Sequence, residues 1–378
     1  MAYAGFAFKN IDHTARDGVV MSLVQSEKPS VADYPTSSPY ASQIAGAKER
    51  FLALLASDDG WQELGEKQGV VLTKKNVKST GILSLSHDKP TERNRRLTGR
   101  KYVVSCRWEM RHRRPSTLTN PVPIVRGEAV VENIAPWELL GGVIRAQEIR
   151  KQWDPRYDNG VYLRRYSQTE VLFHALTKGT RFVAAPRDIV GIQKDFVEAD
   201  GTCIVVQTSV DTDLAVELPK TTRANLNLGA WQFKPEGANT RVTYVVQVAL
   251  NGSIPSMLAS AVANETPLCV ARARDVYYKH GFAPHLKYHK ESETSIVYQF
   301  EDYQPDSRKY ICVLTTGAHN GDSVEIAYDT RKMYASGGVR VSVEGDQSAV
   351  SVSDDGNGTV RVVAQESGKT VTIAVTPK

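Results

Sequence analysis

The apolar positions of this chain follow two periods, and the helical period predicts three helices. Between residues 40 and 56 the apolar side chains lie three and four residues apart, as on one face of a helix. These side chains are Ile44, Ala47, Phe51, Leu54 and Leu55. The same spacing predicts a second helix from Pro136 to about Trp153 and a third from Pro255 to about Lys279. Pro267 should kink the third helix, because a proline removes a backbone hydrogen bond.

The second and third helices should each turn one apolar stripe toward a core. The inward side chains of the second helix are predicted to be Leu139, Leu140, Val143, Ile144 and Ile149, and the outward ones Arg145, Glu148, Arg150 and Lys151. The stripe of the third helix is predicted to be Leu258, Val262, Thr266, Cys269, Ala273 and Val276.

Alternation with a period of two predicts short strands in the rest of the chain. Three precede the second helix, at residues 69–75, 101–110 and 122–132. Six lie between the second and third helices, at 160–166, 169–177, 187–198, 202–210, 222–234 and 240–250. Turn-forming pairs join most of these six, so the sheet should be antiparallel. Seven more strands in the last ninety or so residues predict a small β-sandwich.

Length and composition divide the chain and place it among globular proteins. With 378 residues, 41% of them apolar and 24% charged, the chain is too long for one ordinary core and has the composition of a soluble globular protein. We expect an N-terminal extension at 1–38, an α+β domain at 39–290 and an all-β sandwich at 291–378. Neither a membrane-spanning run nor a secretion leader is evident, so the expected compartment is the cytoplasm.

Charge is unevenly distributed along the chain. Residues 291–378 carry 8 basic and 13 acidic side chains, whereas the whole chain has a net charge of +5. Residues 89–114 contain ten basic side chains and two acidic ones. This segment is either a solvated strand edge or a docking surface for the anionic headgroups of a membrane. A nucleic-acid partner is not expected, because no recognition motif accompanies the charge.

Motifs of catalysis and of metal binding are missing from the sequence. It contains no Gly-x-Ser-x-Gly elbow, phosphate-binding glycine loop or His-Glu-x-x-His helix. His280, His285 and His289 are close in sequence, but Pro284 separates them and no cysteine accompanies them. We therefore expect a binding protein rather than an enzyme, with no cofactor and no metal.

Three separated signatures come in a recognisable order. They are Arg-Lys-Gln-Trp-Asp at 150–154, Pro-Arg-Asp-Ile-Val at 186–190, and Asn-Gly-Ser-Ile-Pro at 251–255 followed by Asn-Glu-Thr-Pro at 264–267. In this order they resemble the START family, the lipid-transfer domains related to the steroidogenic acute regulatory protein. The resemblance is best from 150 to 280 and looser from 40 to 135, with an insertion near 80–118. It implies a helix-grip fold, in which a curved antiparallel sheet wraps around a long C-terminal helix and one lipid lies between them.

The resemblance also implies a set of ligand-binding residues. Arg150 and Asp154 match a pair that lies beside the lipid phosphate in phosphatidylcholine carriers, and their i,i+4 spacing allows an ion pair. His174 and Gln193 match the buried acid and arginine of sterol-binding members. The aromatic cage for choline is replaced, so phosphatidylcholine is disfavoured; its positions read Leu176, Ile189 and Asn227. Arg223 matches an arginine that precedes a long strand, and residues 177–185 match the loop that caps the tunnel. The lid helix would line the tunnel with Leu258, Val262, Thr266 and Cys269.

The expected function is therefore that of a carrier, which holds a sterol, another isoprenoid or a phospholipid in an internal tunnel and moves it between membranes. Two alternatives stay open. One is a helix-grip enzyme that uses His174 with Tyr166 or Tyr244 as acid and base. The other is a lipid-gated scaffold, whose residues 291–378 bind a protein partner.

Overall fold

The computed structural model describes residues 34, 37–76, 123–179, 185–252, 260, 264–290 and 292–378. Three sequence predictions lie wholly or mostly outside these residues: the extension at 1–38, the basic segment at 89–114 with its strand at 101–110, and the capping loop at 177–185. Within the extension, Tyr34 is described. Its hydroxyl group donates to the carbonyl of Tyr298 at 3.1 Å and accepts from the N–H of the same residue at 2.9 Å.

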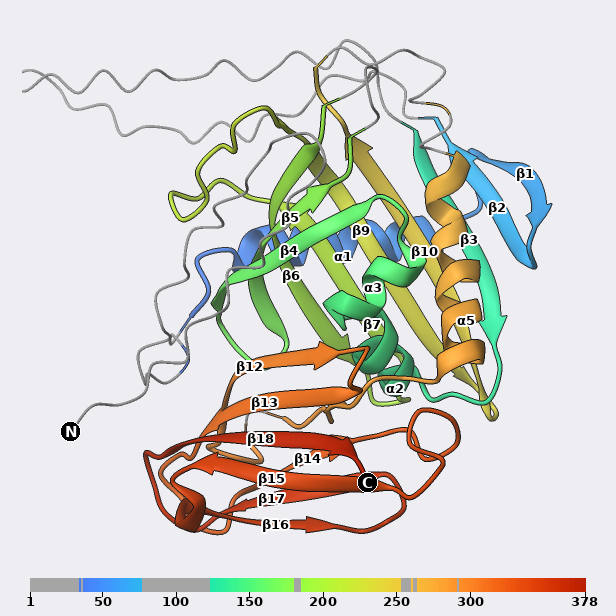
Figure 1. Ribbon diagram of the computed structural model, residues 1–378. Coiled ribbons are helices and arrows are strands. Elements are labelled where there is room, and N and C mark those ends of the chain that lie inside the picture. Colours follow the sequence, from blue (N-terminus) through green and yellow to red (C-terminus); the bar gives the residue numbers. More distant parts are fainter. Residues whose placement is uncertain are drawn as a thin grey trace, which may run out of the picture.

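In the described part of the chain, ten strands form one large sheet (Figure 1), in the order β1-β2-β3-β10-β9-β7-β6-β5-β4 with β8 beside β6. All pairs are antiparallel except β6 with β8. The strands are β1 (Trp61–Lys67), β2 (Val70–Lys75), β3 (Ile124–Val131), β4 (Tyr157–Arg165), β5 (Glu170–Thr177), β6 (Arg187–Val197), β7 (Cys203–Ser209), β8 (Thr222–Arg223), β9 (Asn225–Glu236) and β10 (Asn239–Ala249). The six strands predicted between 160 and 250 are confirmed, with the fifth divided into β8 and β9. Strand β1 was not predicted from the sequence.

Helix α1 (Ala41–Leu55) covers one face of this sheet, as Figure 1 shows behind β6, β7 and β9. Its buried side chains are Ile44, Ala47, Phe51 and Leu54, which confirms the predicted stripe. They pack against alternate residues of the strands, such as Leu172, Ile192 and Val206. We call this the outer face of the sheet.

The third predicted helix packs against the opposite face of the sheet, which we call the inner face (Figure 1). A 3-10 turn, η2 (Thr266–Leu268), contains Pro267 and precedes α5 (Cys269–His280), so Pro267 interrupts the regular helix as predicted. Most of the predicted helix before Asn264 lies outside the described residues. The turn lies close against β3, where a Cβ atom on Gly127 would come within 2.6 Å of the Pro267 carbonyl oxygen. A glycine is therefore needed where the kink meets the sheet.

The prediction of one continuous helix from 136 to 153 is wrong. The segment is divided into α2 (Pro136–Leu139), a π-helical turn η1 (Leu140–Ile144) and α3 (Gln147–Trp153). In the π turn, Arg145 N–H donates to the carbonyl of Leu140 at 2.9 Å, one residue further back than in an α-helix. The inserted residue rotates the rest of the segment about its axis. Arg145, predicted to face outward, therefore has a buried side chain with 7% of its surface exposed.

The last part of the chain is a sandwich of two four-stranded sheets, below the large sheet in Figure 1. Their orders are β11-β14-β17-β16 and β12-β13-β18-β15. The elements are β11 (His285–Leu286), β12 (Val297–Gln304), β13 (Lys309–Thr315), β14 (Ser323–Ala327), β15 (Val339–Gly345), the 3-10 turn η3 (Gln347–Ala349), β16 (Val350–Asp354), β17 (Thr359–Ala364) and β18 (Thr370–Pro377). All seven predicted strands are confirmed, and β11 is additional.

The sandwich and the large sheet share one hydrophobic core rather than a loose contact. A single buried cluster includes Val270 and Tyr277 from α5 together with Tyr298 and Ile326 from the sandwich. Close packing at η1 adds to it, because a Cβ atom on Gly142 would lie 2.6 Å from the carbonyl oxygen of Ala283. The two parts are therefore expected to unfold together.

Acid should weaken this junction through His285, the first residue of β11. Burial lowers the pKa of His285 to about 4, while its Nδ1 shares a hydrogen bond with the Ala283 carbonyl at 3.0 Å. The unfolded chain binds the proton at a higher pH, near 6.5. This contribution to stability is therefore complete above about pH 6.5 and is lost as the pH falls toward 4. Between pH 7.5 and pH 5 we expect a loss of about 2 kcal/mol in the free energy of unfolding.

Urea denaturation at the two pH values measures this loss. The variant His285→Asn should remove most of the difference, whereas His319→Asn, at an exposed position, should leave it unchanged. An equal pH dependence in His285→Asn and the wild type would show that His285 is not responsible.

Candidate functional site

A small cavity lies between the inner face of the sheet and the layer formed by η1 and α3. Its walls are largely aromatic, from Trp153, Tyr157, Phe173, Trp231 and Tyr244. The cavity volume is about 60 Å³, which is room for a few water molecules. Its polar side chains gather in two places, which we call the α3 end and the floor.

The α3 end is formed by Arg150 and Asp154. The Arg150 guanidinium donates to Asp154 Oδ2 from Nε at 3.1 Å and from Nη2 at 2.9 Å, which confirms the predicted i,i+4 pair. The guanidinium also lies over the ring of Tyr157, 4.3 Å from its centre. Burial alone would lower the pKa of Arg150, but the Asp154 charge outweighs it and raises that pKa. The pair is therefore ionised and carries no net charge.

The start of α5 approaches this end of the cavity. Arg156 Nη1 donates to the hydroxyl group of Thr266 at 3.2 Å, and burial lowers the pKa of Arg156. Cys269 is buried, and burial raises the pKa of its thiol to about 12. The thiol is therefore neutral. Thr266 and Cys269 lie near α3 but are not among the residues that border the cavity.

The floor of the cavity is a chain of hydrogen-bonded polar side chains. Gln207 Nε2 donates to Gln193 Oε1 at 2.7 Å, and Gln193 Nε2 donates to Asp195 Oδ1 at 3.0 Å. Arg145 Nη1 lies 3.2 Å from Asp195 Oδ2. Burial raises the pKa of Asp195, and the Arg145 charge opposes that rise. Gln193, Gln207 and Arg145 border the cavity, so the floor offers polar groups to its interior.

His174 and Gln193, which the resemblance places together in the cavity, lie on opposite faces of the sheet. Gln193 pairs with Val171 in the ladder, whereas His174 pairs with Val190. Because side chains alternate along a strand, residues of opposite parity in these two strands point to opposite faces. His174 borders the cavity, but it is two residues from Leu172 on the same strand and therefore points to the same face as Leu172, which packs against α1.

The imidazole of His174 belongs to a buried ionic cluster. Its Nε2 lies 2.9 Å from Asp188 Oδ2, and Arg223 Nε donates to the same oxygen at 2.8 Å. Burial alone would raise the pKa of Asp188, but the hydrogen bonds and charges of His174 and Arg223 bring it below its ordinary value. In this arrangement Arg223 neutralises Asp188 instead of lining the cavity.

The remaining predicted ligand residues are dispersed. Ile189 pairs with Ala175, which borders the cavity. By the alternation along β5, the side chain of Leu176 points to the outer face. Asn227 sits in a bulge between β9 and β10. Leu258 and Val262 lie outside the described residues. For all twelve predicted positions, contact with a ligand stays a prediction.

Several residues that form the cavity were not predicted from the sequence. Gln207 and Trp231 could have been found from the sequence. Gln207 is two residues from Val205 and Trp231 is two residues from Phe233, and both Val205 and Phe233 pack on the inner face. Arg145 could not, because its inward direction results from the π turn. From the sequence, Asp195 would be expected at the surface, because apolar and polar residues alternate along its strand. Its burial is explained by its ion pair with Arg145.

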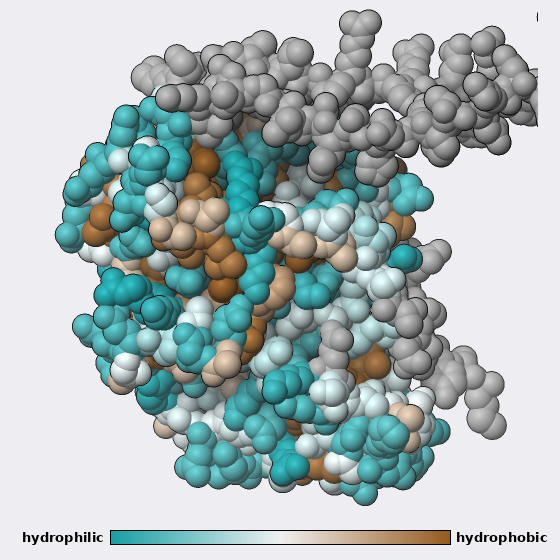
Figure 2. All heavy atoms as spheres, turned by 180° about the vertical axis from the view of Figure 1, so that it is seen from behind, coloured by the Kyte–Doolittle hydropathy of each residue, from teal (hydrophilic) through white to brown (hydrophobic). Residues whose placement is uncertain are grey.

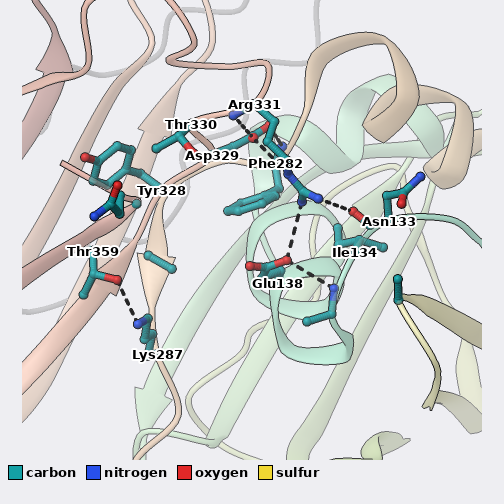
Figure 3. A pocket seen from close by; sticks show the side chains of 15 residues that line it. Asn133, Ile134, Glu138, Phe282, Lys287, Tyr328, Asp329, Thr330, Arg331 and Thr359 are labelled. Carbon is teal, nitrogen blue, oxygen red and sulfur yellow. Dashed lines mark hydrogen bonds and ion pairs between the residues drawn. The ribbon is translucent and has the colours of Figure 1, made fainter. Parts of the chain in front are cut away.

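A larger and more open pocket, of about 330 Å³, lies where the sandwich meets the loop before α2 (Figure 3). Its charged side chains are engaged with their neighbours. Arg331 Nη1 donates to the carbonyl of Asn133 at 2.6 Å and its Nη2 lies 3.8 Å from Glu138 Oε2. Lys287 Nζ donates to the hydroxyl group of Thr359 at 2.9 Å. The pocket is therefore part of a polar interface between the sandwich and the rest of the molecule.

Solved structures of known proteins are similar to part of this chain. Human StAR-related lipid transfer protein 5 is 16% identical, with a TM-score of 0.48 over 62% of this chain and 95% of that one. A STAR-related lipid transfer protein fragment from Xanthomonas axonopodis is 20% identical, with a TM-score of 0.41 over 57% and 98%. A comparison with curated protein sequences gives no match.

The family model of the START domain matches residues 107–276. This range contains the second predicted helix, the strands β3 to β10 and most of α5. The order of these elements, with a curved antiparallel sheet around a kinked C-terminal helix, is the helix-grip fold (Figure 1). Residues 107–276 therefore match the START domain model and have the helix-grip fold, and a β-sandwich follows them.

Proposed function

We propose that the START domain binds one lipid between the inner face of its sheet and the layer of α3 and α5, and carries it between membranes. The observation that supports this most is the cavity itself. Aromatic side chains such as Trp231 and Tyr244 form its walls, and an ion pair without net charge, Arg150 with Asp154, lies at one end. Apolar walls with a few placed polar groups are typical of sites for small apolar ligands.

The cavity must expand to accept such a ligand. Its volume of about 60 Å³ is well below the roughly 300 to 1,000 Å³ of pockets that hold drug-sized molecules. The wall formed by η1 and α3 is interrupted at Arg145 and Ala146, between two separate helical segments. We expect this layer to move outward as the lipid enters.

Energetics favour exchange between protein and membrane. Each buried methylene contributes about 0.8 kcal/mol relative to water, but the bilayer interior provides nearly the same environment. Transfer between the two is therefore close to balanced, and chemical energy is not needed. A neutral or weakly polar lipid, such as a sterol or another isoprenoid, suits the neutral Arg150–Asp154 pair better than a charged headgroup does.

Transfer of a fluorescent sterol between vesicles tests this function. Dehydroergosterol is excited by tryptophan emission, so its binding near Trp153 and Trp231 should give energy transfer. Asp154→Asn should weaken binding about two- to tenfold, because it removes the charged partner of Arg150. Asp275→Asn, which affects an exposed pair with Arg274, is the matched control.

If Asp154→Asn and Asp275→Asn bind the sterol equally well, Asp154 does not take part in binding. If the wild type neither binds nor transfers the sterol or a fluorescent phospholipid, the carrier function is wrong. A chemically altered lipid would instead support an enzyme. A protein partner retained without any lipid would support a scaffold, although the face of the sandwich visible in Figure 2 is mostly hydrophilic.

A further inference from the structure

One sheet of the sandwich ends at an open strand on the side away from the large sheet. This sheet begins at β12, which packs against α3, and ends at β15 (Figure 1). In the described part of the chain, no strand pairs with the outer side of β15. An edge strand of seven residues presents a row of backbone N–H and C=O groups that can pair with a further strand.

The backbone groups of the odd-numbered residues of β15 point outward from the sheet. The carbonyl of Gly338, just before the strand, accepts from the N–H of Lys378 at the end of β18, at 3.2 Å. Because these groups alternate in direction along a strand, those of Val341 and Val343 face away from β18. In agreement, the carbonyl of Val343 accepts from Nε2 of Gln347, an exposed side chain beyond the strand, at 3.0 Å.

The side chains of β15 complement those of a second, antiparallel copy of the same strand. In the register that pairs the whole strand, Val339 lies opposite Gly345, and Ser342 lies on the two-fold axis. Arg340 then lies opposite Glu344 of the partner subunit, and the same pair occurs twice. Both side chains are exposed, and among the described residues neither has an ion-pair partner in its own chain.

The direction of the backbone groups agrees with this register. Opposite residues of an antiparallel pair exchange two hydrogen bonds at every second position. Val341 lies opposite Val343 of the partner subunit, and both present outward N–H and C=O groups. Arg340 and Glu344 occupy the positions between, where opposite Cα atoms come within about 4.5 Å. Opposite charges at such positions stabilise a strand pair, and like charges destabilise it.

We propose that β15 is a self-association edge, at which two copies of this chain join their four-stranded sheets into one continuous sheet. The half-buried side chains of Val341 and Val343, which pack against the core of their own sandwich, gain cover from the second strand. Because β12 lies at the other edge of the sheet, the two lipid cavities are at opposite ends of the dimer. The inference therefore goes beyond the proposed function and does not depend on it.

The sequence of β15 fits its own copy better than it fits an unrelated strand. A strand from another protein would need an acidic and a basic side chain four residues apart and in the right order, whereas β15 supplies both. Charged side chains also protect a solitary edge from mispairing. The two roles differ in their response to a reversal of charge, because protection needs only a charge and pairing needs the opposite one.

Sedimentation velocity of the full-length protein over a range of concentrations tests the inference. One strand pair is a small interface, so we expect a reversible dimer with a Kd of about 1 to 100 µM. Arg340→Glu places like charges opposite each other at both pairs and should weaken the dimer about tenfold or more. Glu344→Arg should have the same effect.

A mixture of the two variants separates association from folding. In an equimolar mixture of Arg340→Glu and Glu344→Arg, each strand meets the opposite charge at both positions. The mixture should therefore form a dimer with a Kd within about threefold of the wild-type value. Arg361→Glu makes the same change of charge at an exposed position of β17, in the other sheet, and should leave the dimer unchanged.

A cysteine on the two-fold axis tests the register itself. Ser342→Cys should give a disulfide-linked dimer on mild oxidation, because Cα atoms that face each other at this position are within the reach of a disulfide. Ser307→Cys, in the exposed turn before β13, should not.

Two results overturn the inference. If the wild type stays monomeric at about 300 µM, the charges of β15 only protect a solitary edge. If a dimer forms but is as strong in Arg340→Glu and in Glu344→Arg as in the wild type, another surface joins the two copies. Either result leaves the proposed lipid-binding function in place, because that function is measured on lipid and not on association.

Discussion

Replacing Asp195 by alanine should lower the free energy of unfolding by about 3 to 5 kcal/mol, because it leaves the guanidinium of Arg145 buried without its nearest counter-charge. Arg145 Nη1 lies 3.2 Å from the Asp195 carboxylate, whereas its other partner, Glu301, is 3.8 Å away. The variant also removes the acceptor for the Gln193 amide. Urea denaturation followed by circular dichroism measures the loss.

Two comparisons assign this loss to its cause. Asp195→Asn keeps an acceptor for Gln193 and removes only the charge, so its loss should be smaller than that of alanine. Asp275→Ala breaks an exposed pair with Arg274, in which Asp275 is 60% exposed, and should cost less than about 1 kcal/mol. A loss below about 1 kcal/mol for Asp195→Ala would mean that water reaches Arg145.

The second large effect is expected at the junction with the sandwich. In Gly142→Ala the new methyl group would lie 2.6 Å from the carbonyl oxygen of Ala283 and 2.8 Å from Cβ of Phe282. Both neighbours are buried, and one contact is with backbone, so they cannot move aside easily. Overpacking of this kind costs about 1 to 3 kcal/mol.

A glycine in another helix provides the control. No atom lies within 4 Å of the Cβ position at Gly46, an exposed site in α1. Gly46→Ala should therefore stabilise the protein by about 0.5 to 1 kcal/mol through helix propensity. If Gly142→Ala is as stable as the wild type, the sandwich does not pack against η1 as described.

Most of the fold could be predicted from the sequence, because its elements follow regular periods. The strands from β4 to β10 alternate inward and outward residues, and α1 repeats Ile44, Ala47, Phe51 and Leu54 at helical spacing. The second helix could not be predicted in its true form. A π turn shifts the period by one residue, and the packing around it, such as that of Gly142 against Ala283, involves residues far apart in sequence.

The candidate site was less predictable than the fold. The pair of Arg150 and Asp154 could be predicted, because both residues lie on one helix and four residues apart. His174 and Gln193 lie on neighbouring strands, where a shift of one residue in register exchanges the two faces. The surroundings of the floor depend on three separate segments, since Arg145 directly follows η1, Asp195 lies in β6 and Glu301 lies in β12. No local pattern brings such residues together.

Elsewhere in the molecule, no helix among the described residues is long and apolar enough to span a membrane. For the basic segment at 89–114, which lies outside the described residues, a solvated strand edge and a docking surface for a bilayer both stay predictions. The interior matters more for the proposed function than this surface does, because a carrier must enclose its ligand.

Photo-crosslinking with a photoactivatable sterol, followed by peptide mapping, tests most directly whether the protein encloses a lipid. If one lipid lies between the sheet and α3, crosslinks should concentrate on inner-face residues such as Phe173, Trp231 and Tyr244, and excess unlabelled sterol should suppress them. Crosslinks confined to α1, to the outer face of the sheet or to the outside of the sandwich would contradict an internal lipid site.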